Sequence, residues 1–204
     1  MSGAPTREVA RRVFASEFND ATYTFKESDE ERAPVYALLP TGERANRVFF
    51  VGTLTETEDV GSDSEYWQGR VVDPSGTFFM YAGQYQPDAA SHLREAEPPE
   101  YVAVVGKPRT YETDEGEVNV SIRPESITTV DAATRDRWVV ETATRTLERL
   151  GAFEEDGEYA RMAREHYGDE GEYDVERYRR AALSALEDLE DEDGNESVEP
   201  EASV

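Results

Sequence analysis

The 204-residue sequence predicts a mainly β fold with additional helices, in which residues 47–130 form a closed five-stranded barrel. Three observations support this prediction. Apolar and polar residues alternate with period two through most of residues 47–130, Gly- and Pro-containing turn sequences separate the alternating runs, and one short helical segment interrupts them between the third and the fourth run.

Residues 1–46 are expected to form an N-terminal extension of one helix and short strands. Apolar residues near its start recur at helical spacing: Val9, Val13, Phe14 and Phe18. This spacing predicts a short amphipathic helix that ends near residue 19. Two extended segments are expected at 22–25 and 35–39, and Pro40, Thr41 and Gly42 predict a turn after the second.

The barrel strands are expected at 48–55, 66–72, 77–82, 101–110 and 118–122. The turn sequence at 73–76 joins the second and third strands into a tight hairpin. A helix is expected at 87–97, where Pro98 and Pro99 end it. Five strands with a helix between the third and the fourth is the element order of an OB-fold barrel.

Helices are expected after the barrel. Asp131 is a suitable N-cap for a helix that ends at Gly151, and 131–151 is expected to be an interaction helix. When the chain is divided into residues 1–46, 47–130, 131–150 and 151–204, only 131–150 has no net negative charge. Residues 152–190 are expected to form a small helical region, with helices at 158–167 and 175–189. Residues 191–204 are acidic and lack periodicity, which predicts a disordered tail.

The charge composition distinguishes between two kinds of acidic protein. The formal net charge is −25 at pH 7, and the basic residues are 19 Arg and only two Lys, Lys26 and Lys107. Disorder alone gives no reason to avoid Lys, whereas a folded surface rich in Asp and Glu is expected of a halophilic protein whose charges are screened by molar salt. A GC-rich genome would also favour Arg over Lys.

Several function classes lack their usual residues. The chain has no Cys and only two His, His92 and His166, so no metal site and no cofactor are expected. It contains no Gly-rich phosphate loop, no HExxH and no Gly-x-Ser-x-Gly, and we therefore expect that it is not an enzyme. The N-terminus lacks an apolar signal core, and no run is long enough to span a membrane, so a cytoplasmic, soluble protein is expected.

The predicted barrel carries candidate nucleic-acid-binding residues. OB folds bind oligonucleotides on strands two and three and the flanking loops, through aromatic stacking and cationic contacts to phosphates. Strands two and three and the loop after them hold Tyr66, Trp67, Arg70, Phe79, Tyr81 and Tyr85. Strand four contributes Lys107, Arg109 and Tyr111 on one face by alternation, and strand five contributes Arg123 with Asn119 and Ser121. Each of Trp67, Phe79 and Tyr81 could equally well be a core residue of the barrel. Lys107, Arg109 and Arg123 could equally well serve only to balance surface charge.

Two parts of the chain resemble a known family. Residues 100–111 and 118–122 resemble strands four and five of the middle-subunit OB fold of replication protein A, with 51–52, 73–76 and 98–99 at matching places. Residues 8–18 and 33–50 are similar to the haloarchaeal replication protein A-associated proteins, small OB proteins that accompany a larger single-strand-binding subunit. The resemblance extends over residues 7–150.

The resemblance implies an accessory subunit of a single-stranded DNA-binding complex in DNA replication and DNA repair, with the larger replication protein A-type subunit as its partner. In replication protein A the helices after the barrels join the subunits, and 131–150 is the matching element here. Its docking residues would be Trp138, Val139, Ala143, Leu147 and Leu150. Alternatively, the helix at 175–189 covers this stripe within the chain. The alternative function is a protein–protein scaffold that does not contact DNA, which the charge of −25 favours.

Overall fold

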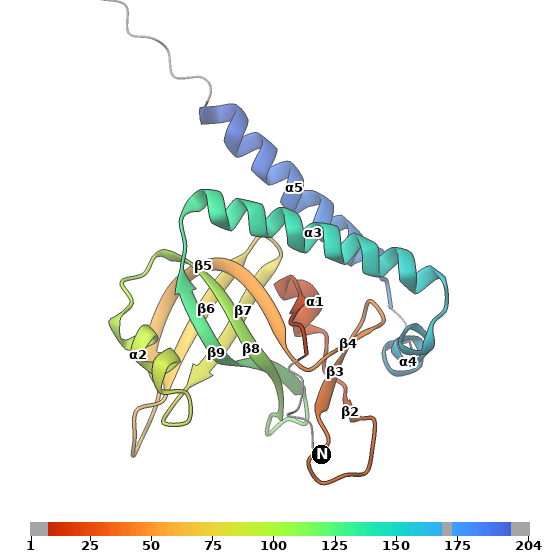
Figure 1. The fold of residues 1–204 in the computed structure, drawn as a ribbon, viewed down its shortest axis with the longest axis horizontal. Coiled ribbons are helices and arrows are strands. Elements are labelled where there is room, and N and C mark those ends of the chain that lie inside the picture. Colours follow the sequence, from red (N-terminus) through yellow and green to blue (C-terminus); the bar gives the residue numbers. More distant parts are fainter. Residues whose placement is uncertain (1–7, 169–172, 197–204) are drawn as a thin grey trace, which may run out of the picture.

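The computed structural model describes residues 8–168 and 173–196, and it contains the expected OB-fold barrel with helical extensions (Figure 1). The barrel strands are β5 (Val48–Asp59), β6 (Trp67–Asp73), β7 (Gly76–Ala82), β8 (Glu100–Glu112) and β9 (Val118–Thr129). They pair in the order β5-β6-β7-β9-β8, and pairing of β5 with β8 closes the barrel. Helix α2 (Pro87–Glu95) lies between β7 and β8 in the chain. The predicted element order is therefore confirmed, although β9 is longer than expected.

Period-two alternation fills the barrel with apolar side chains. Along β7, Phe78, Met80 and Ala82 are buried and alternate with Thr77, Phe79 and Tyr81, which are more exposed. The ring of Phe78 stacks on that of Phe50 with 3.9 Å between the centroids. Strand β5 passes very close to β6 at Gly52. A Cβ atom at this position would lie only 2.4 Å from the Val72 carbonyl oxygen. Only glycine allows this approach.

The N-terminal extension differs from the expectation. It forms β1 (Arg11–Arg12), α1 (Ala15–Asn19) and a small antiparallel sheet of β2 (Thr24–Lys26), β3 (Val35–Leu39) and β4 (Glu43–Ala45). The predicted helix from Val9 is wrong in its first half, since Val9 is 80% exposed and β1 pairs in parallel with the start of β5. Strand β6 pairs only with the later part of β5, so the first residues of β5 have an open edge. The chain near Arg11 pairs with this edge as a strand instead of forming a helix. Helix α1 is held to the barrel by Asp73, whose carboxylate accepts a hydrogen bond of 2.7 Å from the Ala15 amide.

Three helices follow the barrel: α3 (Ala132–Glu154), α4 (Glu158–Tyr167) and α5 (Glu176–Glu196). Asp131 caps α3 as predicted, accepting a hydrogen bond of 2.8 Å from the Thr134 amide. The helix passes through Gly151, because its continuation buries Phe153 against Leu38 and α4, and this burial offsets the roughly 1 kcal/mol cost of a helical glycine. The segment expected to be disordered from 191 is helical as far as Glu196, and 197–204 lie outside the described residues.

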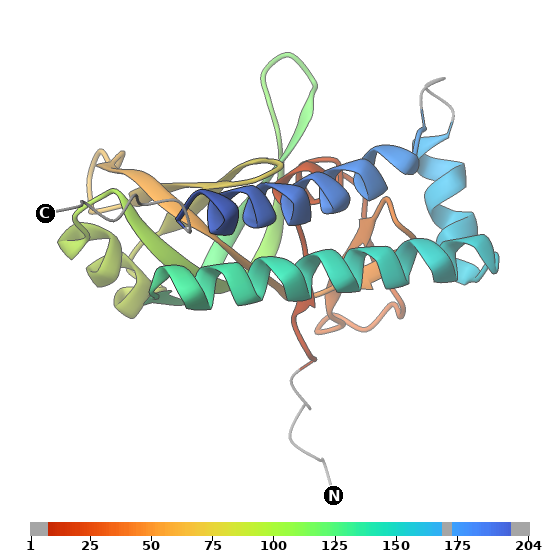
Figure 2. The same cartoon turned by 90° about the horizontal axis from the view of Figure 1, so that it is seen from above.

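The apolar stripe of α3 is covered within the chain, so its assignment as a partner-docking surface is wrong. Helices α3 and α5 lie side by side (Figure 2), and Val139 and Ala143 pack against Ala182 and Ala185. Leu147 and Leu150 are likewise partly or fully buried. Trp138 lies on a different side of α3 from Val139, and one helix cannot cover both sides. The barrel covers the side that carries Trp138.

Trp138 contacts the barrel strand β5 and the β1 residue Arg12. Its ring lies edge-on to Phe49, with 5.3 Å between the centroids, and the guanidinium of Arg12 lies 4.2 Å from the Trp138 ring centroid and 4.6 Å from that of Phe49. Strand β1 thus closes the side of α3 that α5 leaves open. None of the helices in the described part of the chain is both long enough and apolar enough to cross a membrane.

Candidate nucleic-acid interface

A groove of about 510 Å³ runs between the outer side of the β6–β7 hairpin and the β8–β9 hairpin. Figure 2 shows the β8–β9 hairpin projecting on the side opposite α3. The residues that line the groove are Tyr66, Tyr81, Tyr85, Gln86, Arg109, Thr110, Tyr111, Ser121, Ile122 and Arg123. The loops between β5 and β6 and between β8 and β9 flank it, which is the usual position of an OB-fold binding face.

The register of β8 and β9 places the cationic side chains. Arg109 lies opposite Ser121, Lys107 opposite Arg123, and Tyr111 opposite Asn119. Residues directly opposite one another in an antiparallel pair point to the same face, so this set shares one side of the hairpin, as alternation predicts. Lys107 lies at the end of this row, where it lines the neighbouring grooves instead of the tyrosine-lined one.

Tyrosine rings supply the apolar part of the groove. Tyr66 and Tyr81 are stacked, with 5.7 Å between ring centroids and an interplanar angle of 16°, and the Gln68 amide donates a hydrogen bond of 2.7 Å to the Tyr81 hydroxyl. Tyr66 is 46% exposed, Tyr111 47% and Tyr85 83%. Exposed rings at the edge of a groove are available to stack on flat ligands such as nucleobases.

The loop that carries Tyr66 is fixed by Asp59. Its carboxylate accepts hydrogen bonds of 3.0 Å from the amides of both Tyr66 and Gly61. These donors, that of Tyr66 first, hold the pKa of Asp59 below its ordinary value. The aspartate is therefore ionised at neutral pH and keeps Tyr66 beside the groove.

Three cations of the hairpin have no counter-ion among the described residues. In the described part of the chain no carboxylate forms an ion pair with Lys107, Arg109 or Arg123, whereas Arg47 is paired with Glu125 and Arg70 with Glu56. Lys107 and Arg123 are also direct cross-strand neighbours, an arrangement of like charges that destabilises a sheet. In a chain of net charge −25, cations left unpaired side by side are suited to an anionic ligand.

The remaining predicted residues lie elsewhere. Trp67 is the clear correction: it packs against the barrel core, because it alternates in phase with the buried Gly69 and Val71. Its indole Nε1 is buried and has no hydrogen-bond partner among the described residues. Arg70 and Phe79 are opposite one another on the outer face of β6 and β7, but outside the groove. Of the lining residues, Gln86, Thr110 and Ile122 were missed, since none of them has a sequence signal for binding.

A metal site has no support in the described residues, where no group of three or more His, Cys, Asp or Glu side chains could hold an ion. His92 lies 3.4 Å from a Glu100 oxygen, and the ring of His166 stacks on that of Tyr23 with 3.5 Å between the centroids. His92 therefore contacts a carboxylate, and His166 contacts an aromatic ring.

Comparisons with known proteins show only distant similarity. No protein-family model and no curated protein sequence matches the chain. Among solved structures, it is similar to the OBody AM3L09 bound to hen egg-white lysozyme (15% identity over 46% of this chain and 89% of that chain, TM-score 0.37). It is also similar to the mitochondrial single-stranded DNA binding protein Rim1 from S. cerevisiae (15% identity, 42% and 94%, TM-score 0.33). A third is asparaginyl-tRNA synthetase from Pyrococcus horikoshii (12% identity, 42% and 19%, TM-score 0.34). These values are too low to transfer a function.

Proposed function

We propose that the groove between the β6–β7 and β8–β9 hairpins binds single-stranded nucleic acid. One observation carries the proposal: exposed tyrosine rings and unpaired cations converge in a single groove of a chain with net charge −25. Bases stack on Tyr66, Tyr85 and Tyr111, while Arg109 and Arg123 contact the phosphates. Neither part of the groove depends on base identity, so the proposed binding is independent of sequence.

The energetics fit binding at high salt. Stacking of one base on an aromatic side chain is worth about 1–3 kcal/mol, and it does not depend on counter-ion release. The phosphate contribution falls with salt concentration, with a slope of roughly −0.7 per contacted phosphate for single strands. Few cations and several rings are therefore a suitable combination for a protein in molar salt, where screening also weakens repulsion by the acidic surface.

The more specific proposal is an accessory subunit of a replication protein A-type single-stranded DNA-binding complex in replication and repair, with a binding role and no catalysis. The resemblance of residues 7–150 to the haloarchaeal replication protein A-associated proteins supports it. The larger subunit must dock elsewhere than on the covered stripe of α3. Co-purification from halophilic cells at native salt tests this assignment, and absence of a larger single-strand-binding protein from the purified complex would contradict it.

A scaffold that never contacts nucleic acid is the second candidate, and the net charge of −25 favours it. Fluorescence anisotropy with a labelled single-stranded oligonucleotide in molar KCl separates the two. Under our proposal Tyr111→Ala weakens binding by about 5- to 150-fold, the equivalent of 1–3 kcal/mol for one stacked base, and Arg109→Glu weakens it too, more strongly as the salt concentration is lowered. Phe79→Ala and Arg70→Glu are matched controls, because both residues lie on the same strands or sheet outside the groove.

Equal losses in the groove variants and the controls would contradict the assignment of the groove. No binding by the wild-type protein, alone or with its co-purified partner, would favour the scaffold.

A further inference from the structure

The tyrosine-lined groove continues into a second groove of about 500 Å³ on the other side of the β8–β9 pair. The second groove lies between these strands and the N-terminal extension, which contributes the β2–β3 connection and the residues just before β5. Arg109 and Arg123 line both grooves, so the two are continuous along the hairpin.

Positive charge dominates this second groove. Among the described residues, Arg32, Arg47, Lys107, Arg109 and Arg123 line it together with a single carboxylate, that of Glu8. Glu8 accepts hydrogen bonds of 2.8 Å from the Tyr36 hydroxyl and 3.3 Å from Arg44, which also pairs with Glu27.

The roles of the cations differ. Arg47 is fixed by Glu125 and donates a hydrogen bond of 3.2 Å to the Glu8 carbonyl oxygen. Arg32, like Lys107, Arg109 and Arg123, forms no ion pair with a carboxylate within residues 8–168 and 173–196. The groove therefore presents, around one space, four cations that have no carboxylate partner in the described part of the chain.

The side chains of this groove also indicate which part of a nucleic acid fits. Its other lining residues are Ala33, Pro34, Val35, Asn46 and Pro108, and none is aromatic. Among its described residues this groove thus offers cations for phosphates and no aromatic ring for base stacking. This contrasts with the tyrosines on the other side of the hairpin.

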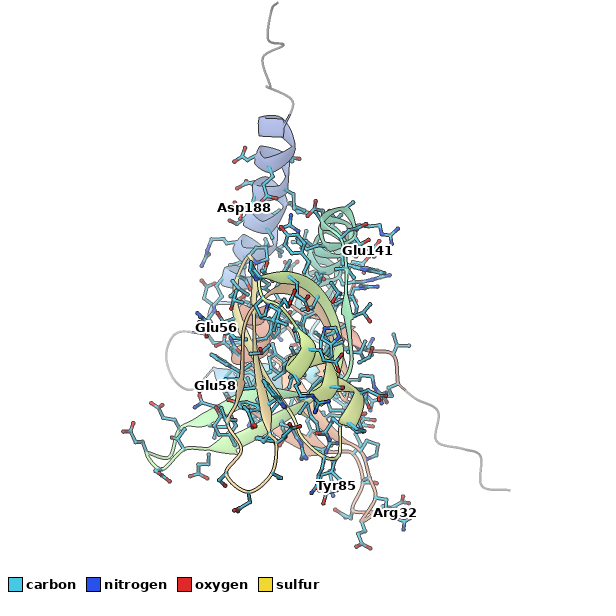
Figure 3. The ribbon with its side chains drawn as sticks, turned by 90° about the vertical axis from the view of Figure 1, so that its left-hand side faces the viewer. Arg32, Glu56, Glu58, Tyr85, Glu141 and Asp188 are labelled. Carbon is cyan, nitrogen blue, oxygen red and sulfur yellow. The ribbon has the colours of Figure 1, made fainter. Side chains whose placement is uncertain are left out.

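Part of the acidic surface lies on other sides of the molecule, although the exposed carboxylates of Asp29, Glu30 and Glu31 directly precede Arg32 in the chain. In Figure 3, Arg32 and Tyr85 point toward the same end of the molecule, whereas Glu56 and Glu58 lie along one flank and Glu141 and Asp188 lie near the helices at the opposite end. The tip of the β2–β3 connection and the entrance of the tyrosine-lined groove thus share one end.

We propose that the second groove binds the sugar–phosphate backbone of the same strand after it leaves the tyrosine-lined groove. The N-terminal extension would then lengthen the binding site beyond the barrel. This inference rests on the proposed function, and it assigns a binding role to Arg32.

Oligonucleotide length tests the inference in molar KCl. A single OB fold occupies about 4–16 nucleotides, so anisotropy is measured with strands at the two ends of this range. We expect the long strand to bind more tightly than the short one. Arg32→Glu should remove this gain and leave the short strand unaffected. Lys26→Glu is the matched control, because Lys26 is exposed on the same extension and does not line the groove.

Two further measurements identify backbone contacts. An extension of abasic phosphodiester units on the short strand should give the same gain as natural nucleotides. Arg32→Glu should also reduce the salt slope for the long strand by roughly 0.7, the value for one phosphate contact.

The outcomes are distinguishable. If the short strand binds but neither natural nor abasic extension raises the affinity, or if Lys26→Glu acts like Arg32→Glu, the inference is wrong and the proposed function stands. If a gain requires bases, the second groove is not a backbone site. If the short strand does not bind at all, the proposed function fails, and this inference fails with it.

Discussion

Removal of the guanidinium of Arg149 should destabilise the protein strongly, because it would leave a buried carboxylate unpaired. Arg149 on α3 is 8% exposed, and Glu17 on α1 is 0% exposed. Their side chains form two hydrogen bonds, of 2.5 Å from Nη2 and 3.2 Å from Nε. Thr41 donates a hydrogen bond to the same carboxylate and accepts one of 3.1 Å from Arg149. This network joins the helix after the barrel to the N-terminal extension.

The expected magnitude follows from the cost of a buried, uncompensated charge. Breaking such a pair by removing one partner costs about 3–5 kcal/mol. For a chain of this size 1 kcal/mol corresponds to roughly 2–4 °C in melting temperature, so Arg149→Met should lower it by roughly 6–20 °C. Replacing both partners, as in Glu17→Leu with Arg149→Met, should recover most of the loss, because neither charge then remains.

Thermal unfolding followed by circular dichroism in molar KCl is the assay. Arg145→Met is the matched control, since Arg145 lies on the same helix in an exposed ion pair with Glu148 at 2.7 Å. Salt screens that pair but not the buried one, so the control should melt almost as the wild type does. Equal shifts for Arg149→Met and Arg145→Met, or a double variant less stable than Arg149→Met, would refute the reasoning.

Three other predictions concern the surface, the helix pair and the groove. Dialysis from molar to millimolar KCl should unfold the protein, as its carboxylates then repel one another, and an unchanged cooperative melt by circular dichroism would contradict adaptation to salt. Ala182→Leu should overpack the α3–α5 contact and cost about 1–3 kcal/mol in urea unfolding, while Leu183→Ala, at an exposed position, should have little effect. Asp59→Ala should loosen the loop of Tyr66 and weaken oligonucleotide binding a few-fold by anisotropy, with only a small decrease in melting temperature. Because the pKa of Asp59 is lowered in the folded state, its stabilising contribution is complete above the ordinary aspartate pKa of about 3.9 and is lost as the pH falls through the lowered value.

Much of the groove could be predicted from alternation alone. The register of β8 and β9 puts Arg109 and Tyr111 on one face with Ser121, which the period of two requires. Alternation does not say which face of a strand is inside when both carry large apolar or aromatic residues. Trp67 therefore became a core residue and Tyr81 a groove residue, and only the closed barrel distinguishes them.

The second groove could not be predicted, because its cations come from distant parts of the chain. Arg32 follows a polar run with no regular spacing, and its neighbours in the groove, Lys107 and Arg123, are on β8 and β9. Their proximity depends on where the small sheet of the N-terminal extension packs against the barrel. No local pattern of residue types encodes that position.

The sequence by itself determined the local elements of this protein: the strand pattern of the OB fold, the cap of α3 at Asp131, and the amphipathic character of α3 and α5. Only the tertiary structure decided what each apolar face contacts. The stripe with Val139 and Ala143 is equally suited to a partner helix and to α5, because burial of apolar area has no direction and does not distinguish the chain's own residues from another's. In the folded chain α5 lies alongside α3, and β1 completes the cover over Trp138.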